Sequence, residues 1–231
     1  MGTENAERIQ TSILNRLEKK ALVWLAQRQP SWMTSDTLTY FGVVAAVLYA
    51  VFCWMSQSNI YYLWAASFCL VLNWYGDSLD GTLARVRETQ RPKYGFFIDH
   101  SLDALTTCLF CIGLGLAPLM YLSIALFIMG GYLCMSIYTY LSTIIMGKFR
   151  LTYASLGPTE MRLIIIAVFI IRMYCPVLTE YTYDILGQPW TVFDGIGALV
   201  AAALFLIYIG SLAKDLKALA KIDPPHKYDG K

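Results

Sequence analysis

Six long apolar runs recur along the chain, with polar stretches between them. They cover residues 37–56, 60–80, 95–117, 119–146, 161–179 and 191–213. Each run has about the 17–25 residues that a helix needs to cross a bilayer. The pattern predicts an all-α integral membrane protein with six transmembrane helices. Since the runs use most of the chain, we expect a single membrane domain over residues 1–231, with the six helices in 37–213.

Amphipathic and polar segments flank the six runs. Residues 3–28 carry apolar side chains four positions apart, with basic residues around them; the apolar positions are Ile9, Ile13, Leu17, Ala21 and Leu25. This spacing predicts an N-terminal amphipathic helix that lies in the membrane interface. Residues 214–231 are polar and include a double proline, which cannot continue a helix. We therefore expect a cytoplasmic tail after the last run.

The distribution of basic residues predicts the orientation. Five Lys or Arg residues precede the first run, four lie in 85–93, three lie around the connection between the fourth and fifth runs, and five follow the last run. The other three connections carry none. Cytoplasmic loops are rich in Lys and Arg, so both termini and the segment 85–93 are expected in the cytoplasm. Arg172, inside the fifth run, is the exception: it lies near the outer face or pairs with an internal acid.

Composition agrees with a membrane location. Apolar residues make up 57% of the chain, charged residues only 15%, and the mean hydropathy is +0.51. The net charge of +2 says little, but its basic residues gather on the side of the membrane that attracts anionic lipid. We expect membrane lipids and no nucleic acid as partners, and the bacterial inner membrane as the location.

Four aspartates form two stripes at helical spacing. Asp77 and Asp80 are three residues apart, so they share a face at the end of the second run. Gly95, Asp99 and Asp103 are four residues apart and form one stripe on the third run. The connection between the two runs is short, which makes their helices antiparallel neighbours. The two stripes are therefore expected to converge at the cytoplasmic face.

Converging carboxylates indicate a divalent-metal site. Four negative charges in one small volume repel one another by several kcal/mol at low dielectric, and divalent cations relieve this repulsion. Oxygen ligands favour Mg²⁺, Mn²⁺ or Ca²⁺ over zinc. In the alternative interpretation, each acid is a solvated group at a helix end that pairs with Arg87 or Lys93. Four acids on two matched stripes, with small residues beside them, favour the metal site.

The same stretch resembles the signature of the CDP-alcohol phosphotransferase (CDP-alcohol phosphatidyltransferase) family. The family pattern is D-x-x-D-G-x-x-A-R, then a gap, then G-x-x-x-D-x-x-x-D. It is matched at Asp77, Asp80, Gly81, Ala84, Arg85, Gly95, Asp99 and Asp103. The gap is one residue longer here than in the family pattern, and the extra residue falls in the loop. The resemblance extends to the chain length, the six runs and the interfacial helix.

The resemblance implies a membrane enzyme of phospholipid synthesis. Such an enzyme transfers a substituted phosphate group from a CDP-linked donor to an acceptor hydroxyl, with release of CMP. By resemblance, two Mg²⁺ or Mn²⁺ ions are held by Asp77, Asp80, Asp99 and Asp103, and Asp103 is also the base for the acceptor hydroxyl. The nucleotide would lie against Asp77, Gly81, Ala84, Arg85 and Gly95. A homodimer is also implied.

Two further features bear on the substrates. His100 follows Asp99, so residues 99–103 read D-H-S-L-D. This looks like the D-H-x-x-D of the choline and ethanolamine phosphotransferase branch, which implies that His100 is a catalytic acid or base. Alternatively, His100 is an interfacial histidine that points away from the aspartate stripe. Residues 157–162 (GPTEMR) begin the fifth run, and a helix N-terminus favours anions. Arg150, Glu160 and Arg162 therefore could hold a phosphate or an acceptor, or Glu160 is only a helix-end charge and the arginines only follow the positive-inside rule.

The donor is left open by the sequence. His100 favours transfer from CDP-choline or CDP-ethanolamine to diacylglycerol. The compact size favours CDP-diacylglycerol as donor, with a small polar alcohol such as inositol phosphate, glycerol phosphate or serine as acceptor. A divalent-cation transporter is an alternative of another class, because carboxylates on adjacent helices also suit cation passage, and a non-catalytic scaffold is a third. The acids cluster near one face and match the full motif, which favours the enzyme.

Overall fold

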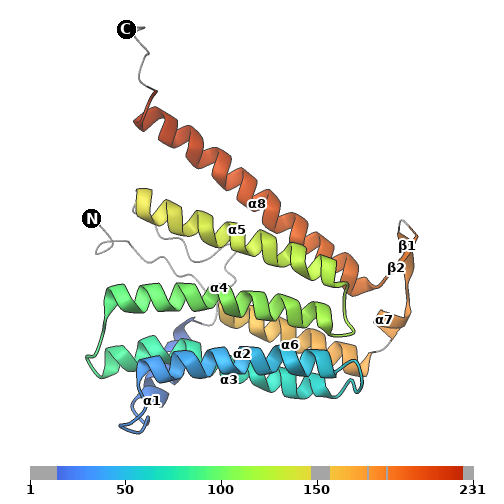
Figure 1. Cartoon of the computed structure of the whole chain (residues 1–231), viewed down its shortest axis with the longest axis horizontal. Helices are drawn as coiled ribbons and strands as arrows, with labels where there is room; N and C mark the ends of the chain where they lie inside the picture. Colours follow the sequence, from blue (N-terminus) through green and yellow to red (C-terminus); the bar gives the residue numbers. More distant parts are fainter. Residues whose placement is uncertain (1–14, 147–156, 176, 186, 226–231) are drawn as a thin grey trace.

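The computed structural model describes residues 15–146, 157–175, 177–185 and 187–225 (Figure 1). Within these ranges the chain is helical apart from one short hairpin and its connections. The elements are α1 (Asn15–Ala26), α2 (Ser35–Met55), α3 (Tyr62–Val86), α4 (Pro92–Leu116), α5 (Leu122–Met146), α6 (Pro158–Tyr174), α7 (Val177–Glu180), β1 (Tyr183–Ile185), β2 (Gln188–Trp190) and α8 (Val192–Ile222). The all-α prediction is confirmed, with the antiparallel pair β1–β2 as a small addition.

The long helices alternate in direction and form one bundle. Helix α2 packs against α3 and α4, α3 also packs against α6, and α4 packs against α5, which in turn packs against α8. In Figure 1 the end of α3 and the beginning of α4 lie at the left, α6 begins nearer the middle of the bundle, and the C-terminal end of α8 lies at the upper left. The hairpin and α7 lie at the opposite end.

In the described part of the chain, four helices are long and apolar enough to cross a membrane: α2, α4, α5 and α8. Helix α3 is also 25 residues long, but its second half carries Asp77, Asp80 and Arg85. Helix α6 has only 17 residues and carries Glu160, Arg162 and Arg172. The structure therefore supports an all-α membrane protein, and the count of six spans stays a prediction.

Two predicted boundaries differ from the structure. The fifth run, 161–179, is divided because α6 ends at Tyr174 and a separate turn of helix, α7, begins at Val177. Cys175 precedes Pro176, and the residue before a proline is disfavoured in the α conformation. The last helix does not end at 213 but continues to Ile222, just before the double proline. The expected tail is thus helical over 214–222, and 226–231 lie outside the described residues.

The helix predicted over 3–28 is described from Asn15 to Ala26, and residues 3–14 lie outside the described part of the chain. Leu22 and Ala26, one turn apart, are buried against Leu38 of α2 and against Leu79 and Leu83 of α3. Ala21, on the predicted apolar stripe, is instead exposed. Leu25, also on the predicted stripe, is partly buried against the same cluster, so the contact face of α1 is displaced from the predicted stripe but overlaps it.

A close crossing of small residues sets the position of α3 on α2. A methyl group at Gly76 would lie 2.6 Å from the Leu38 carbonyl oxygen and 2.7 Å from the Gly42 nitrogen, so only glycine fits there. Small residues let membrane helices approach closely. The Asn73 side chain also donates to the Gly42 carbonyl at 2.9 Å. Asp77, the next residue after Gly76, is consequently held beside α2.

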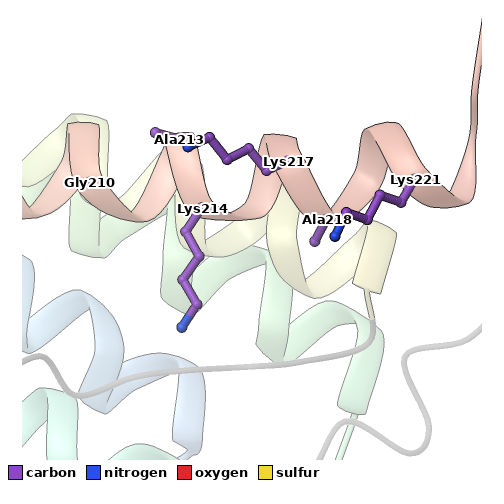
Figure 2. Close-up of a pocket in the computed structure, with 6 residues that line it drawn as sticks. All are labelled: Gly210, Ala213, Lys214, Lys217, Ala218 and Lys221. Atoms are coloured by element: carbon purple, nitrogen blue, oxygen red, sulfur yellow. The ribbon is translucent and has the colours of Figure 1, made fainter.

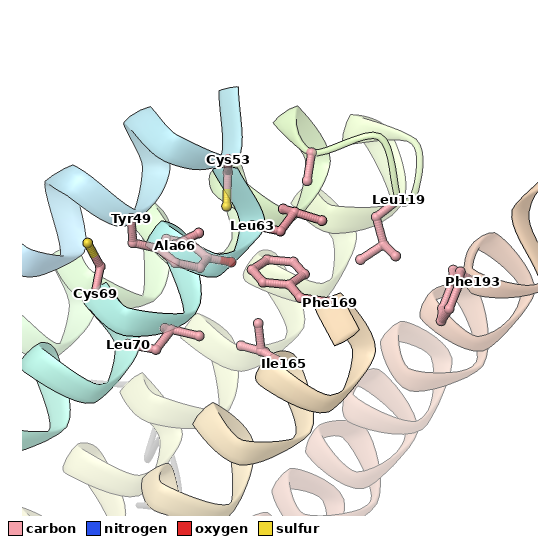
Figure 3. Close-up of a cluster of buried hydrophobic side chains, with 11 residues drawn as sticks. Tyr49, Cys53, Leu63, Ala66, Cys69, Leu70, Leu119, Ile165, Phe169 and Phe193 are labelled. Carbon is pink, nitrogen blue, oxygen red and sulfur yellow. The ribbon is translucent and has the colours of Figure 1, made fainter. Parts of the chain in front are cut away.

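The opposite end of the bundle contains the apolar core (Figure 3). Tyr49 of α2 is fully buried and stacks on Phe169 of α6, with ring centroids 6.0 Å apart. Arg172 donates to the Pro118 carbonyl at 2.7 Å, and Asp194 accepts from the Tyr121 backbone N–H at 2.7 Å. Arg172 therefore binds a backbone carbonyl of the α4–α5 turn at this end of the bundle. These contacts join α2, α4, α6 and α8 at one end and leave the other end for polar groups.

Basic residues of the α3–α4 loop bind the connection between α1 and α2. Arg87 donates to the carbonyls of Gln29 and Pro30, each at 2.9 Å, and to the carbonyl of Met33. Arg91 pairs with Asp36 at the start of α2, and this hydrogen bond raises the pKa of Arg91 above its usual value. Arg87 is therefore not a partner of the four aspartates, which removes one support of the solvated-acid interpretation.

Candidate active site

The aspartates converge at a small cavity between α2, α3 and α4. Three of the four carboxylates contribute to its walls, and its volume is about 10 Å³. The lining residues are Thr39, Gly42, Val43, Asn73, Asp77, Asp99, Leu102, Asp103 and Thr106. This volume holds about one water molecule or one small ion. The antiparallel stripes predicted from the spacing thus meet as expected.

Asp80 is the fourth carboxylate and is held one layer away from the cavity. Its side chain is buried and accepts from the Thr39 hydroxyl at 2.5 Å and from the Gly81 backbone N–H. The Ser35 hydroxyl donates to the Asp80 carbonyl at 2.9 Å. Thr39 also lines the cavity, so its side chain links Asp80 to the wall of the site.

Arg162 brings a positive charge to these acids. Its Nη2 donates to Asp77 Oδ2 at 2.6 Å and its Nε donates to Asn73 Oδ1 at 2.9 Å. Only 7% of Arg162 is exposed. Its Nη1 is buried and has no hydrogen-bond partner among the described residues. A buried donor without a partner is costly, so this nitrogen is available for an acceptor atom from a ligand.

The charge of the cluster remains negative. Asp103 lies close enough to Asp77, Asp80 and Asp99 for their charges to interact, and Arg162 offsets only one of the four. Asp99, His100 and Asp103 each offer a ligand atom, and these atoms all lie within 4.8 Å of one another. Carboxylate oxygens suit Mg²⁺ and Mn²⁺. The donor set therefore fits a hard divalent cation at this position.

His100 lies between α4 and α5. Its Nδ1 is 3.4 Å from Asp99 Oδ2, and its side chain is 16% exposed. The ring stacks on Phe96 with centroids 4.1 Å apart, and the Tyr140 ring lies 4.9 Å away. The imidazole therefore faces a neighbouring helix next to the acids. This position is compatible with a catalytic acid or base and with an interfacial histidine. The activity of a variant without His100 therefore distinguishes the two interpretations.

The predicted nucleotide residues lie beside open space. Among the described residues, a methyl group added at Gly95 would meet nothing within 4 Å, and one at Gly81 would have only Arg85 Nη1, at 3.6 Å, as a neighbour. Ala84 is partly buried, whereas Arg85 is exposed and donates to the Thr82 hydroxyl at 2.9 Å. This face of α3 and α4 leaves room for a bulky group close to the backbone.

The remaining predicted residues are at the start of α6. Glu160 is buried and accepts from the Gly157 backbone N–H at 3.0 Å, so it caps its own helix. Arg150 lies outside the described residues.

Two residues beside the acids were not predicted, Thr39 and Asn73. Asn73 is four residues before Asp77 on the same helical face, a spacing that could have identified it, whereas Thr39 joins the site only through the packing of α2 on α3.

Comparison with known proteins agrees with this geometry. A profile described as CDP-alcohol phosphatidyltransferase matches residues 32–212. A phosphatidylinositol phosphate synthase from Cutibacterium acnes is 34% identical over 71 residues, which is 31% of this chain and 32% of that protein. The chain thus aligns with about a third of the length of this relative. Since the profile covers more than half of the chain, including the aspartate motif, the chain belongs to the CDP-alcohol phosphatidyltransferase family.

Proposed function

We propose that the protein transfers a phosphatidyl group from CDP-diacylglycerol to the hydroxyl of a small polar alcohol that carries a phosphate, with release of CMP. The observation that carries this choice is Arg162, a buried cation beside the aspartate cavity whose Nη1 has no hydrogen-bond partner among the residues that the structure describes. A guanidinium is well suited to bind phosphate oxygens in pairs. Diacylglycerol, the acceptor in the aminoalcohol alternative, has no such group. The name of the Cutibacterium acnes relative also supports a phosphorylated acceptor.

We assign two Mg²⁺ or Mn²⁺ ions to Asp77, Asp80, Asp99 and Asp103. When bound, such ions neutralise the charge of a pyrophosphate and of the leaving CMP. Gly81 and Gly95 are assigned to the nucleotide because they border open space, Asp77 and Ala84 are assigned to it by their place in the motif, and Arg85 is assigned to its phosphates. Support for this assignment comes from the donor set and from the open face of α3 and α4.

Asp103 is proposed as the base. Its carboxylate takes the proton of the acceptor hydroxyl, and the acceptor oxygen forms a bond to the phosphorus that carries diacylglycerol. The bond from this phosphorus to the bridging oxygen breaks, and CMP leaves with the electron pair. The proton then passes from Asp103 to water. Arg162 holds the acceptor phosphate so that its hydroxyl faces Asp103, and the N-terminus of α6 adds favourable partial charge.

We further propose six spans, with both termini and the aspartate end in the cytoplasm. Helix α3 is about 37 Å long, which exceeds the roughly 30 Å of a bilayer core. Helix α8 is about 46 Å long and carries Lys214, Lys217 and Lys221 beyond that thickness. These lysines border a hollow of about 470 Å³ (Figure 2). They lie at the aspartate end of the bundle, as cytoplasmic basic residues should. We also propose that α1 lies in the membrane interface, that the protein resides in the bacterial inner membrane, and that it forms a homodimer.

A panel of donors and acceptors tests this function. Purified protein would be assayed for CMP release with CDP-diacylglycerol, CDP-choline or CDP-ethanolamine, each with inositol phosphate, glycerol phosphate, serine or diacylglycerol, in Mg²⁺ and in Mn²⁺. We expect turnover of CDP-diacylglycerol with a phosphorylated acceptor. Arg162→Gln should raise the KM for that acceptor more than the KM for the donor, while Lys217→Gln should change neither. CMP release only from CDP-choline or CDP-ethanolamine with diacylglycerol would overturn the proposal.

The aminoalcohol reaction is the second candidate, because His100 lies beside Asp99 in the position that D-H-x-x-D implies. In that reaction the donor is a soluble CDP-aminoalcohol and the acceptor is diacylglycerol. The two candidates share the metal and nucleotide residues and differ at His100 and Arg162. A histidine variant therefore separates them, as argued below.

A further inference from the structure

One carboxylate oxygen outside the aspartate site joins three helices. Glu18 Oε1 on α1 accepts from the Trp74 indole N–H of α3 at 2.7 Å. The same oxygen accepts from the Thr159 hydroxyl of α6, also at 2.7 Å. Hydrogen bonds to an ionised acceptor are stronger than those between neutral groups. Glu18 therefore couples the start of α6 to the middle of α3.

Both donors lie close in the chain to residues of the candidate site. Trp74 follows Asn73, which accepts from Arg162 Nε and donates to Gly42. Thr159 is in the first turn of α6, three residues before Arg162. A shift of the first turn of α6 relative to α3 would therefore move the Arg162 guanidinium away from Asn73 and Asp77.

Glu18 is itself held in place by the packing of α1. Glu18, Leu22 and Ala26 are four residues apart and share one face of the helix. Leu22 and Ala26 are buried against α3, with exposed fractions of 7% and 2%. Lys19 and Lys20 are exposed on the other side. The carboxylate of Glu18 is thus directed to the crossing of α3 and α6 by apolar contacts that do not involve the aspartate site.

We propose that Glu18 is a positioning residue for the acceptor site: it fixes the first turn of α6 against α3, so that Arg162 Nη1 stays directed into the ligand position. This inference rests on the proposed function of Arg162 as the acceptor-phosphate ligand. Glu18 touches neither the acids nor the substrates. Its loss should therefore act on acceptor binding and leave donor binding intact.

Kinetics with separate substrate titrations test the inference. Glu18→Ala should raise the KM for inositol phosphate or glycerol phosphate by about tenfold or more, since small displacements of binding groups have effects of this size, with the KM for CDP-diacylglycerol unchanged. Glu18→Gln keeps an oxygen that accepts both hydrogen bonds and should restore most of the acceptor affinity. Lys19→Ala, on the exposed side of α1, is the matched control and should behave like the parent protein.

A double-mutant cycle gives an independent readout. If Glu18 acts through Thr159, the acceptor KM of Glu18→Ala combined with Thr159→Val should equal that of the worse single variant, because interacting residues are not additive. Multiplied effects, an equal change in both substrate constants, or a Gln variant as poor as the Ala variant would overturn the inference. If Arg162→Gln raises the acceptor KM and Glu18→Ala does not, only this inference fails. If neither acceptor is turned over, the proposed function fails and the inference fails with it.

Discussion

At the scale of single residues, the four aspartates are held in different ways. Asp77 pairs with Arg162, and Asp80 accepts from Thr39 and Gly81. Asp99 and Asp103 face the same cavity without an arginine in hydrogen-bond contact among the described residues. A cation is therefore needed most at the α4 stripe, because the negative charge there is least compensated by the protein itself.

Removing the charge of the α4 stripe should abolish activity. We expect Asp99→Asn and Asp103→Asn each to lower CMP release by about 10²-fold or more, through loss of a metal ligand and of the base. Asparagine has almost the same size, so membrane insertion and yield should not change. Asp223→Asn, at the exposed end of α8, is the control and should keep full turnover. Near-normal turnover in either α4 variant would refute the assignment.

His100→Ala should reveal the donor class. With CDP-diacylglycerol as donor, Asp103 is the base and His100 is not an acid or base of the reaction, so we expect a loss of less than roughly tenfold. In the aminoalcohol reaction, loss of a general acid or base should cost about 10²-fold or more. The measurement is CMP release by parent and variant with each donor. A severe defect together with turnover of CDP-choline or CDP-ethanolamine would favour the second candidate.

At the scale of helices, the sequence predicts the residues of the candidate site better than the helix contacts that hold those residues in place. Hydropathy locates the long helices, and the spacing of Asp77, Asp80, Asp99 and Asp103 predicts their convergence, because both are local properties. The displaced contact face of α1, the role of Glu18 and the contact of Thr39 with Asp80 depend on which helices pack together, and no local pattern encodes that. The end of α6 before Pro176 has a local cause in the sequence, so it could have been predicted from the sequence alone.

Two glycines with opposite surroundings separate packing from ligand binding. Gly76→Ala places a methyl group 2.6 Å from the Leu38 carbonyl oxygen, and we expect it to destabilise the protein by about 1–3 kcal/mol and to lower activity through movement of Asp77. Gly95→Ala meets nothing within 4 Å among the described residues and should leave stability unchanged. Its methyl group enters the space assigned to the nucleotide and should raise the KM for the CDP-donor by roughly tenfold. Thermal inactivation and donor titration measure the two effects.

The comparison between these two variants carries the test. If Gly95→Ala binds the donor as well as the parent protein does, the open space beside α4 is not the nucleotide site. If Gly76→Ala keeps both stability and turnover, the close crossing of α2 and α3 is not required to position Asp77. Neither result can be explained by a general effect of adding a methyl group, since the same group is added in both.

At the scale of the whole molecule, the two ends of the bundle differ in chemistry. One end contains the aromatic core around Tyr49 and Phe169, and the other contains the acids, Arg162 and the lysines of α8. The acids reduce the hydropathy of α3, and the arginines have the same effect on the short α6. Helices α3 and α6 are therefore not among the four candidate spans that length and composition identify in the described part of the chain, although the apolar runs predicted both. Helix α3 packs against α2 and α6 packs against α3, and the six-span count stays a proposal.

Accessibility of single cysteines should distinguish six spans from four. In a variant without the six native cysteines, one cysteine would be placed at Ser58, Thr89 or Pro225, all exposed in connections or after α8. If α3 spans the membrane, the positions before and after it, 58 and 89, lie on opposite sides. If only α2, α4, α5 and α8 span, they lie on the same side. We expect an impermeant thiol reagent added to intact cells to label position 58 alone, because the basic residues place 89 and 225 in the cytoplasm. Labelling of both 58 and 89 would exclude α3 as a span. Labelling of 225 without 58 would show that the orientation is reversed and that the aspartate end lies at the outer face.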